Sequence, residues 1–174
     1  LIRKQQSDDK PAAACAPAGK NKTLICFSDN LDRAIATFIL ANGAAATGSK
    51  VSIFFTFWGL NVIKKKHGPA VKKTLTEKMF AHMLPKSSDS LALSKMNMMG
   101  MGSKMIRGIM KKKNIDSLES LIRQAMDNGV EFIACQMTMD MMGIKKEELL
   151  DGVTVGGVAS YMQKAEEAGV NLFI

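Results

Sequence analysis

The residue best placed for chemistry in this sequence is Cys135, one of three cysteines. It ends the apolar run 130–135 and precedes the expected start of a helix near Thr138. Free backbone N–H groups and the positive end of a helix dipole at such a position favour the thiolate over the thiol. A thiolate is a nucleophile and can carry a second sulfur as a persulfide. This interpretation predicts a partly accessible thiol, whereas the alternative is a small buried apolar residue.

The other thiols and the histidines occupy less favourable positions. Cys26 lies within an expected strand, where an inert core thiol is expected, and Cys15 lies in an Ala/Pro-rich stretch. His67 and His82 are expected on the surface or in loops, away from the strand ends. No Cys-x-x-Cys pair occurs, so a structural zinc site is not expected. A sparse, odd set of cysteines is typical of a reducing compartment, which predicts a cytoplasmic protein.

Further candidates follow the ends of the other expected strands, because functional groups of an open parallel sheet gather beyond its carboxyl ends. They are Ser28, Asp29 and Asn30, then Trp58 and Gly59, then Gln136, Met137 and Thr138 beside Cys135, and finally Gly156 and Gly157. Asp29 could orient a group at the site, although a helix cap is the commoner role. The glycine pair could admit a ligand to the backbone or simply make a tight turn.

The elements that must position these residues alternate between strand and helix. Short apolar runs predict strands at 23–27, 51–57, 130–135, 153–155 and 170–174. Such alternation predicts a three-layer α/β/α sandwich around a mainly parallel, five-stranded sheet.

Apolar residues at helical spacing predict helices that begin near Leu31, Asp116 and Val158. Asp116 and Glu119 have the spacing of a capping box. Less regular helices are expected over 71–84 and 103–113. The expected core face of the last helix comprises Val158, Tyr161, Met162 and Ala165.

The chain divides into a short leading segment and one domain. Residues 1–20 lack periodicity and are rich in Ala and Pro, which is typical of a linker or of the tail of a preceding domain. Residues 21–174 form the expected α/β domain. No apolar run reaches about 18 residues, so no membrane-spanning helix is expected.

The net charge and the methionine content indicate interaction surfaces more than a catalytic or metal site. The net charge of +8 would suit a nucleic acid, an anionic membrane or an acidic protein, but scattered Lys and scarce aromatics favour a solubilising role. Eleven of the fourteen methionines lie between Met96 and Met142. Such clusters can bind Cu(I) or adaptable partners, but more commonly fill a core or a subunit interface. A loop or lid is therefore expected over 85–103, and homo-oligomerisation is expected through the Met-rich segment 85–110.

Four segments together resemble the DsrE/DsrF-like sulfur-relay family, in its Met-rich branch, whose members are often labelled peroxiredoxin-family proteins. They are FFTFWGL at 54–60, SKMNMMGMG at 94–102, CQMTMD at 135–140 and GGVA at 156–159. The resemblance covers about residues 22–174, and CQMTMD is its most specific part. The Pro-x-x-x-Thr-x-x-Cys pattern of peroxide chemistry does not precede Cys135.

The resemblance implies that Cys135 accepts sulfane sulfur as a persulfide and passes it on, in an oligomer that needs no cofactor. The implied partners are donor or acceptor proteins with a reactive cysteine, rhodanese-like or TusA-like. Nucleic acid is not expected, and membrane contact is peripheral at most. Two other hypotheses stay open: a non-catalytic scaffold or membrane-peripheral subunit, and a redox sensor in which Cys135 is oxidised to sulfenic acid.

Overall fold

The computed structural model describes residues 21–69, 71, 74, 79 and 83–174, and a five-stranded sheet lies at its centre. The strands, in the spatial order β4-β3-β2-β1-β5, are β1 (Asn21–Cys26), β2 (Val51–Phe55), β3 (Glu131–Cys135), β4 (Thr154–Gly156) and β5 (Ala168–Phe173). Every pairing between these strands is parallel. Their carboxyl ends therefore share one edge of the sheet.

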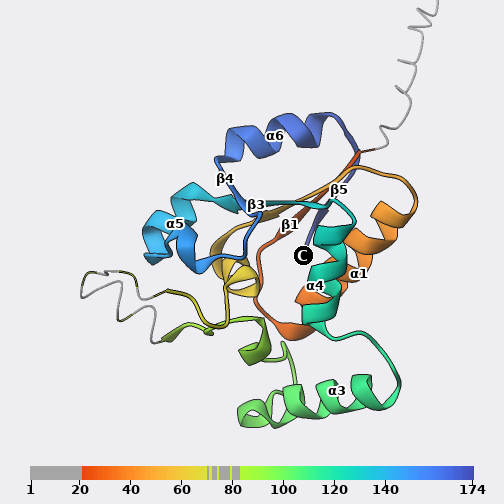
Figure 1. Cartoon of the computed structure of the whole chain (residues 1–174), viewed down its shortest axis with the longest axis vertical. Helices are drawn as coiled ribbons and strands as arrows, with labels where there is room; N and C mark the ends of the chain where they lie inside the picture. The colour runs from red at the N-terminus through yellow and green to blue at the C-terminus, as the bar shows by residue number, and fades with distance from the viewer. Residues whose placement is uncertain (1–20, 70, 72–73, 75–78, 80–82) are drawn as a thin grey trace, which may run out of the picture.

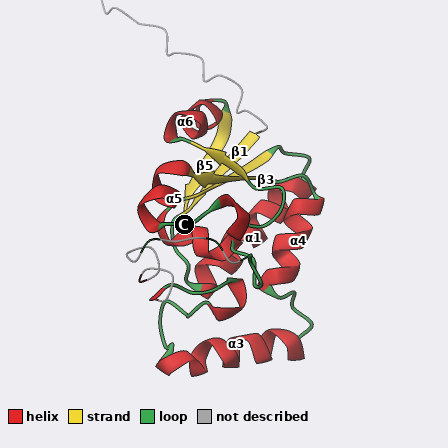
Figure 2. Cartoon of the chain, turned by 60° about the vertical axis from the view of Figure 1, so that its left-hand side comes forward, coloured by secondary structure: helices red, strands yellow, loops and turns green. Residues whose placement is uncertain are grey.

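Helices cover both faces of the sheet, which confirms the expected three-layer α/β/α sandwich (Figure 1). The α-helices are α1 (Leu31–Ala46), α3 (Met101–Lys112), α4 (Leu118–Asp127), α5 (Gln136–Met142) and α6 (Val158–Glu166). Short 3-10 helices are η1 (Phe57–Ile63), η2 (Ser88–Ser90), η3 (Met98–Gly100) and η4 (Lys146–Glu148). Figure 2 shows α1 and α4 side by side, α6 at the opposite end, and α3 set apart from the sheet.

The main core lies between the sheet and the pair α1 and α4. Its centre is a trio of aromatic rings, Phe38 of α1, Phe55 of β2 and Phe132 of β3, whose centroids lie 5.4–6.2 Å apart. All three side chains are at most 2% exposed. Because side chains alternate along a strand, Phe54 and Ile133 point to the opposite face. There they form a smaller buried cluster with Cys135 and Tyr161.

Two sequence-based expectations about helix ends and faces are wrong. Ser117, not Asp116, caps α4, because the extended backbone of Ser117 lets its hydroxyl accept the amide N–H of Ser120 at 3.2 Å. In α6, Val158 and Met162 do not face the core but are 54% and 49% exposed. These two residues are four positions apart and therefore lie on the same face of the helix.

The face of α6 that packs on the sheet carries Tyr161 and Ala165 instead. All strand boundaries agree with expectation to within two residues. The expected strand 51–57 ends at Phe55 and gives way to η1. Most of the expected helix over 71–84 lies outside the described residues. None of the described helices is long and apolar enough to span a bilayer.

The aromatic trio predicts where the fold is most sensitive to substitution. Phe38→Ala should lower the free energy of unfolding by about 3–5 kcal/mol, because it leaves a cavity that the surrounding rings cannot fill. Urea denaturation followed by circular dichroism measures the change. The neighbouring Ile39→Ala is the control, since that side chain is 53% exposed and should cost much less. Equal losses for both variants would contradict this description of the core.

Candidate functional site

Cys135 lies where two helix starts meet the carboxyl edge of the sheet. It is the last residue of β3 and the residue from which α5 begins. It also pairs in register with Gly156 of β4, and the next residue, Gly157, caps α6. Backbone N–H groups at the start of a helix lack intrahelical partners and favour negative charge nearby. Cys135 thus lies next to the starts of two helices.

The thiol of Cys135 is nevertheless buried, with only 1% of the residue exposed, so the expected partial accessibility is wrong for this structure. The cause is the alternation of side chains along β3. Cys135 shares the face of Ile133 and belongs with it to the buried cluster that includes Phe54 and Tyr161. A reagent or partner can reach the sulfur only if this cover moves.

The cover over this cluster is α6, and α6 is lightly anchored. Of its nine residues, all of them described, only Tyr161 is buried. The Tyr161 ring lies 5.1 Å from that of Phe54, and its hydroxyl is 3.3 Å from Oγ1 of Thr23. The ion pair between Lys164 and Glu131, at 2.9 Å, lies between two half-exposed side chains and contributes little. One aromatic residue therefore holds most of the cover in place.

The other side of the site is held by polar contacts between β2 and α5. Oγ1 of Thr56 lies 3.0 Å from Oγ1 of Thr138, and the amide N–H of Phe57 donates to the same Thr138 oxygen at 3.4 Å. Thr138 is fully buried. Phe57 has a φ of +48°, which costs a non-glycine residue on the order of 1–2 kcal/mol. The fold accepts this strain immediately beside the end of β3.

The polar residues after β1 interact with one another and with η1. The hydroxyl of Ser28 donates to Oδ1 of Asn30 at 2.7 Å and accepts the Asn30 amide at 3.2 Å. The carboxylate of Asp29 accepts from the side-chain amide of Asn61 at 3.0 Å. Asn30, not Asp29, is the capping residue of α1. Asp29 therefore joins the end of β1 to η1 and does not serve as a helix cap.

Asn61 and Gly59 explain how η1 packs so closely against β1. Asn61 is completely buried, and its Oδ1 has no hydrogen-bond partner among the described residues. A Cβ atom at Gly59 would lie 2.0 Å from the carbonyl oxygen of Cys26, so only glycine fits there. Sequence reasoning missed Asn61. The available signal was a polar residue within the otherwise apolar run 57–63.

The two glycines after β4 have different roles. A Cβ atom at Gly156 would lie 2.9 Å from Cγ2 of Ile133, so glycine allows β4 to pack beside the small cluster. Gly157 has open space around it, and nothing in the structure explains glycine at that position. This pair therefore marks the connection between β4 and α6.

The remaining candidates lie on the rim of the site. Gln136 donates from its side-chain amide to Asp140 one helical turn later, at 2.9 Å, and is exposed. Met137 and Trp58 are 60% and 43% exposed. These three side chains are thus available to an incoming molecule and do not contribute to the buried cluster.

Aromatic side chains extend this rim along the carboxyl edge. The ring of Phe27 lies 5.2 Å from that of Phe57 and 5.7 Å from that of Phe173, which is 68% exposed. We call these three residues and Trp58 the aromatic rim. By strand alternation, Phe27 and Phe173 lie on the α6 side of the sheet, as Cys135 does.

Cys26 differs from Cys135 although both end a strand. Burial raises the pKa of the Cys26 thiol from its ordinary value of 9.0 to about 12, so the thiol stays protonated and inert at neutral pH. His67 is exposed, whereas His82 and Cys15 lie outside the described residues. Within the described part of the chain, no three His, Cys, Asp or Glu side chains are grouped as metal ligands.

The chain is similar to known proteins over most of its length. Residues 18–173 match the model of the DsrE/DsrF/DrsH-like family. The chain is 50% identical over 155 residues to the uncharacterized protein YrkE of Bacillus subtilis, covering 89% of this chain and 97% of that protein. It is 37% identical over 156 residues to the sulfur carrier protein DsrE2 of Allochromatium vinosum, covering 89% of this chain and 98% of that protein.

Among solved structures, a protein of unknown function from Methanobacterium thermoautotrophicum, MTH1491, has the same fold. The two structures superpose with a TM-score of 0.52 at 14% sequence identity, over 88% of this chain and 98% of the other. At that identity the similarity concerns the fold alone, and it agrees with the α/β/α sandwich.

The light anchoring of α6 predicts how Cys135 can be exposed. Tyr161→Ala should raise the rate of Cys135 alkylation by at least about tenfold, because it removes the main contact that closes α6 over the sheet. Mass spectrometry of iodoacetamide-treated protein measures this rate. Met162→Ala, at an exposed position of the same helix, should leave the rate unchanged. If Tyr161→Ala alkylated as slowly as wild type, α6 would not be the cover.

The pKa of Cys26 predicts an alkaline loss of stability. Above pH 9 the unfolded chain releases this thiol proton whereas the folded chain retains it to about pH 12. The free energy of unfolding should therefore fall by up to about 1.4 kcal/mol per pH unit in that range. Urea titrations from about pH 8 to about pH 11 should show a shallower fall for Cys26→Ala than for wild type. Equal slopes would contradict the raised pKa.

Proposed function

Because this chain belongs to the DsrE/DsrF/DrsH-like family, we propose that it is a sulfur carrier whose working group is the thiol of Cys135. The observation that carries the proposal is the position of this thiol, at the end of β3, at the start of α5 and beside the cap of α6. A 37% identical relative named as a sulfur carrier supports the same role.

The loading step is an exchange at sulfur. The thiolate of Cys135 attacks the outer sulfur of a donor persulfide, so that a new S–S bond forms at Sγ while the S–S bond of the donor breaks. The donor leaves as a thiolate and takes up the proton that Cys135 released. No oxidant, reductant or cofactor is consumed, because one persulfide replaces another.

The unloading step repeats this exchange with an acceptor thiol. The acceptor thiolate attacks the outer sulfur on Cys135, which then departs as the thiolate. Helix starts that favour an anionic sulfur assist both the attacking and the leaving form of Cys135. The donor and the acceptor each bring their own cysteine, as rhodanese-like or TusA-like proteins do.

Both steps require that α6 moves, because the sulfur is buried in the closed structure. The contacts of Thr138 with Thr56 and Phe57 hold the opposite side of the site fixed. An opening of α6 about the pair Gly156 and Gly157 would expose Cys135 without disturbing this side. Burial between transfers would protect a loaded persulfide from small thiols.

The proposal predicts which cysteine carries sulfur. Cys135→Ser should abolish loading from polysulfide, whereas Cys26→Ser and Cys15→Ser should load as wild type does, because Cys26 is protonated and Cys15 lies outside the matched residues. The measurement is the mass of each cysteine-containing peptide, which increases by one sulfur atom on loading. Equal loading of all three variants would show that the reaction does not depend on the site.

The aromatic rim predicts a second, separable effect. We propose that the donor protein docks on this rim, because Trp58 and Phe173 are exposed and the rim lies at the same edge of the sheet as Cys135. Trp58→Ala should slow transfer from a persulfidated rhodanese-like protein by about tenfold or more, since buried aromatic anchors dominate such interfaces. Loading from inorganic polysulfide should not change. If both donors slowed equally, Trp58 would shape the site instead of binding the partner.

A further inference from the structure

Helix α3 presents a row of apolar side chains to the solvent. Met101, Met105 and Ile109 are spaced four residues apart and are 67%, 53% and 42% exposed. The preceding loop adds Met98 and Met99, which are 68% and 103% exposed. Residues four apart lie on one face of a helix. We call these five side chains the methionine face, and solvent exposure of so many large apolar groups marks an interaction surface.

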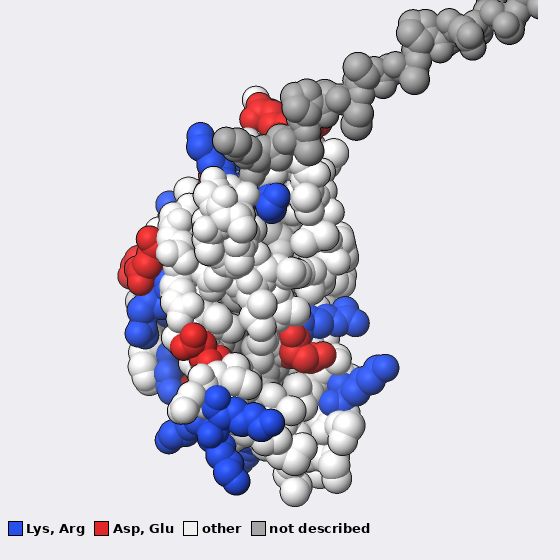
Figure 3. Space-filling model, turned by 90° about the vertical axis from the view of Figure 1, so that its right-hand side faces the viewer, with Lys and Arg blue, Asp and Glu red and all other residues white. Residues whose placement is uncertain are grey.

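The chain segment that carries this face has charge of one sign. Between Asp89 and Asp116 the chain has no acidic residue and six cations, namely Lys95, Lys104, Arg107, Lys111, Lys112 and Lys113. Lys104, Lys111 and Lys112 are exposed, and none of them forms an ion pair with a described residue. Figure 3 shows Lys and Arg gathered towards the end of the molecule that α3 occupies. This excess of lysines therefore favours an anionic occupant.

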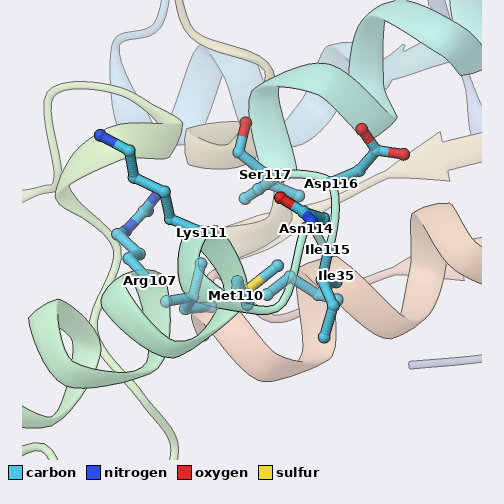
Figure 4. Close-up of a pocket in the computed structure, with 10 residues that line it drawn as sticks. Ile35, Arg107, Met110, Lys111, Asn114, Ile115, Asp116 and Ser117 are labelled. Carbon is cyan, nitrogen blue, oxygen red and sulfur yellow. The ribbon is translucent and has the colours of Figure 1, made fainter.

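The opposite face of α3 is already occupied within the protein, which fixes the orientation of the helix. Met110 points towards the body and helps to line a cavity of about 440 Å³ between α1, α3 and α4 (Figure 4). Arg107 donates to the carbonyl of Ser88 at 2.7 Å and pairs with Glu119 at 3.2 Å. The methionine face is thus held outward.

The loop before α3 also exposes its methionine side chains to the solvent. Met98 and Met99 have φ values of +40° and +56°, and Gly100 has +91°. Positive φ values strain residues other than glycine. The chain accepts this strain at two side chains that make no buried contact, as the exposure of both shows.

We propose that α3 and its preceding loop form the surface by which this protein binds an anionic lipid bilayer. The methionine face would enter the boundary between headgroups and acyl chains, while the flanking lysines contact the headgroups. The helix lies along the outside of the molecule (Figure 2), so a deformable bilayer can meet its whole length without a complementary groove. Contact of this kind is peripheral.

Charge distinguishes this occupant from a second copy of the chain. Two copies that packed α3 against α3 would bring two sets of six cations together. Such like-charge contacts oppose association. An anionic bilayer gains from each exposed lysine of this segment, at about fivefold in partition per lysine near the surface.

Vesicle flotation with the full chain tests the proposal without any sulfur chemistry, so its result is independent of the sulfur-carrier function. Wild type should float with vesicles of phosphatidylcholine and phosphatidylglycerol, should not float with phosphatidylcholine alone, and should dissociate as salt is added. Met99→Glu/Met105→Glu and Lys104→Glu/Lys111→Glu should each reduce binding by at least about tenfold.

Matched controls separate the surface from overall charge. Val158→Glu/Met162→Glu and Lys50→Glu/Lys146→Glu introduce the same charge changes at exposed positions elsewhere and should bind as wild type does. Circular dichroism confirms that each variant is folded. Absence of binding to anionic vesicles at low salt would overturn the proposal, as would equal effects of the control variants. A dimer that Met99→Glu/Met105→Glu dissociates, without any vesicle binding, would assign the surface to a second copy instead.

Discussion

The parallel pairing of the five strands is the constraint on which the candidate site depends. Because every strand runs in the same direction, the segments after β1, β2 and β3 all reach the same edge of the sheet. Side-chain hydrogen bonds then join these ends in sequence, Asp29 to Asn61 and Thr56 to Thr138. A slip of one residue in β3 would turn Cys135 to the opposite face of the sheet. The register therefore determines where the thiol lies.

The two sides of the site differ in how firmly they are held. Thr138, fully buried and hydrogen-bonded, fixes α5 to the end of β2, whereas α6 rests on the sheet mainly through Tyr161. Elements with few buried contacts are those that open locally at low cost. A buried thiol beneath a light cover is thus compatible with a carrier that must hide its cargo between partners. The thiol of Cys26, at the end of β1, is also buried, and burial raises its pKa to about 12, so that it stays protonated.

Most of the fold could be predicted from the sequence because its signals are local. Apolar runs and helical spacing identify the strands and helices, and their alternation implies a parallel sheet with Cys135 at its carboxyl edge. Burial of Cys135 and exposure of Met162 could not be predicted, because both depend on which face of a short helix meets the sheet. The orphaned oxygen of Asn61 likewise arises from the packing of η1 against β1, which no local pattern records.

The central claim is that Cys135 both receives and gives up sulfur. The most direct measurement loads the protein with isotopically labelled sulfane sulfur, removes the donor, and adds an excess of an acceptor protein with one reactive thiol. The account predicts that the label leaves the peptide containing Cys135 and appears as a persulfide on the acceptor, in a single turnover. Label that remains on Cys135, or that is released only as sulfide, would contradict a carrier function.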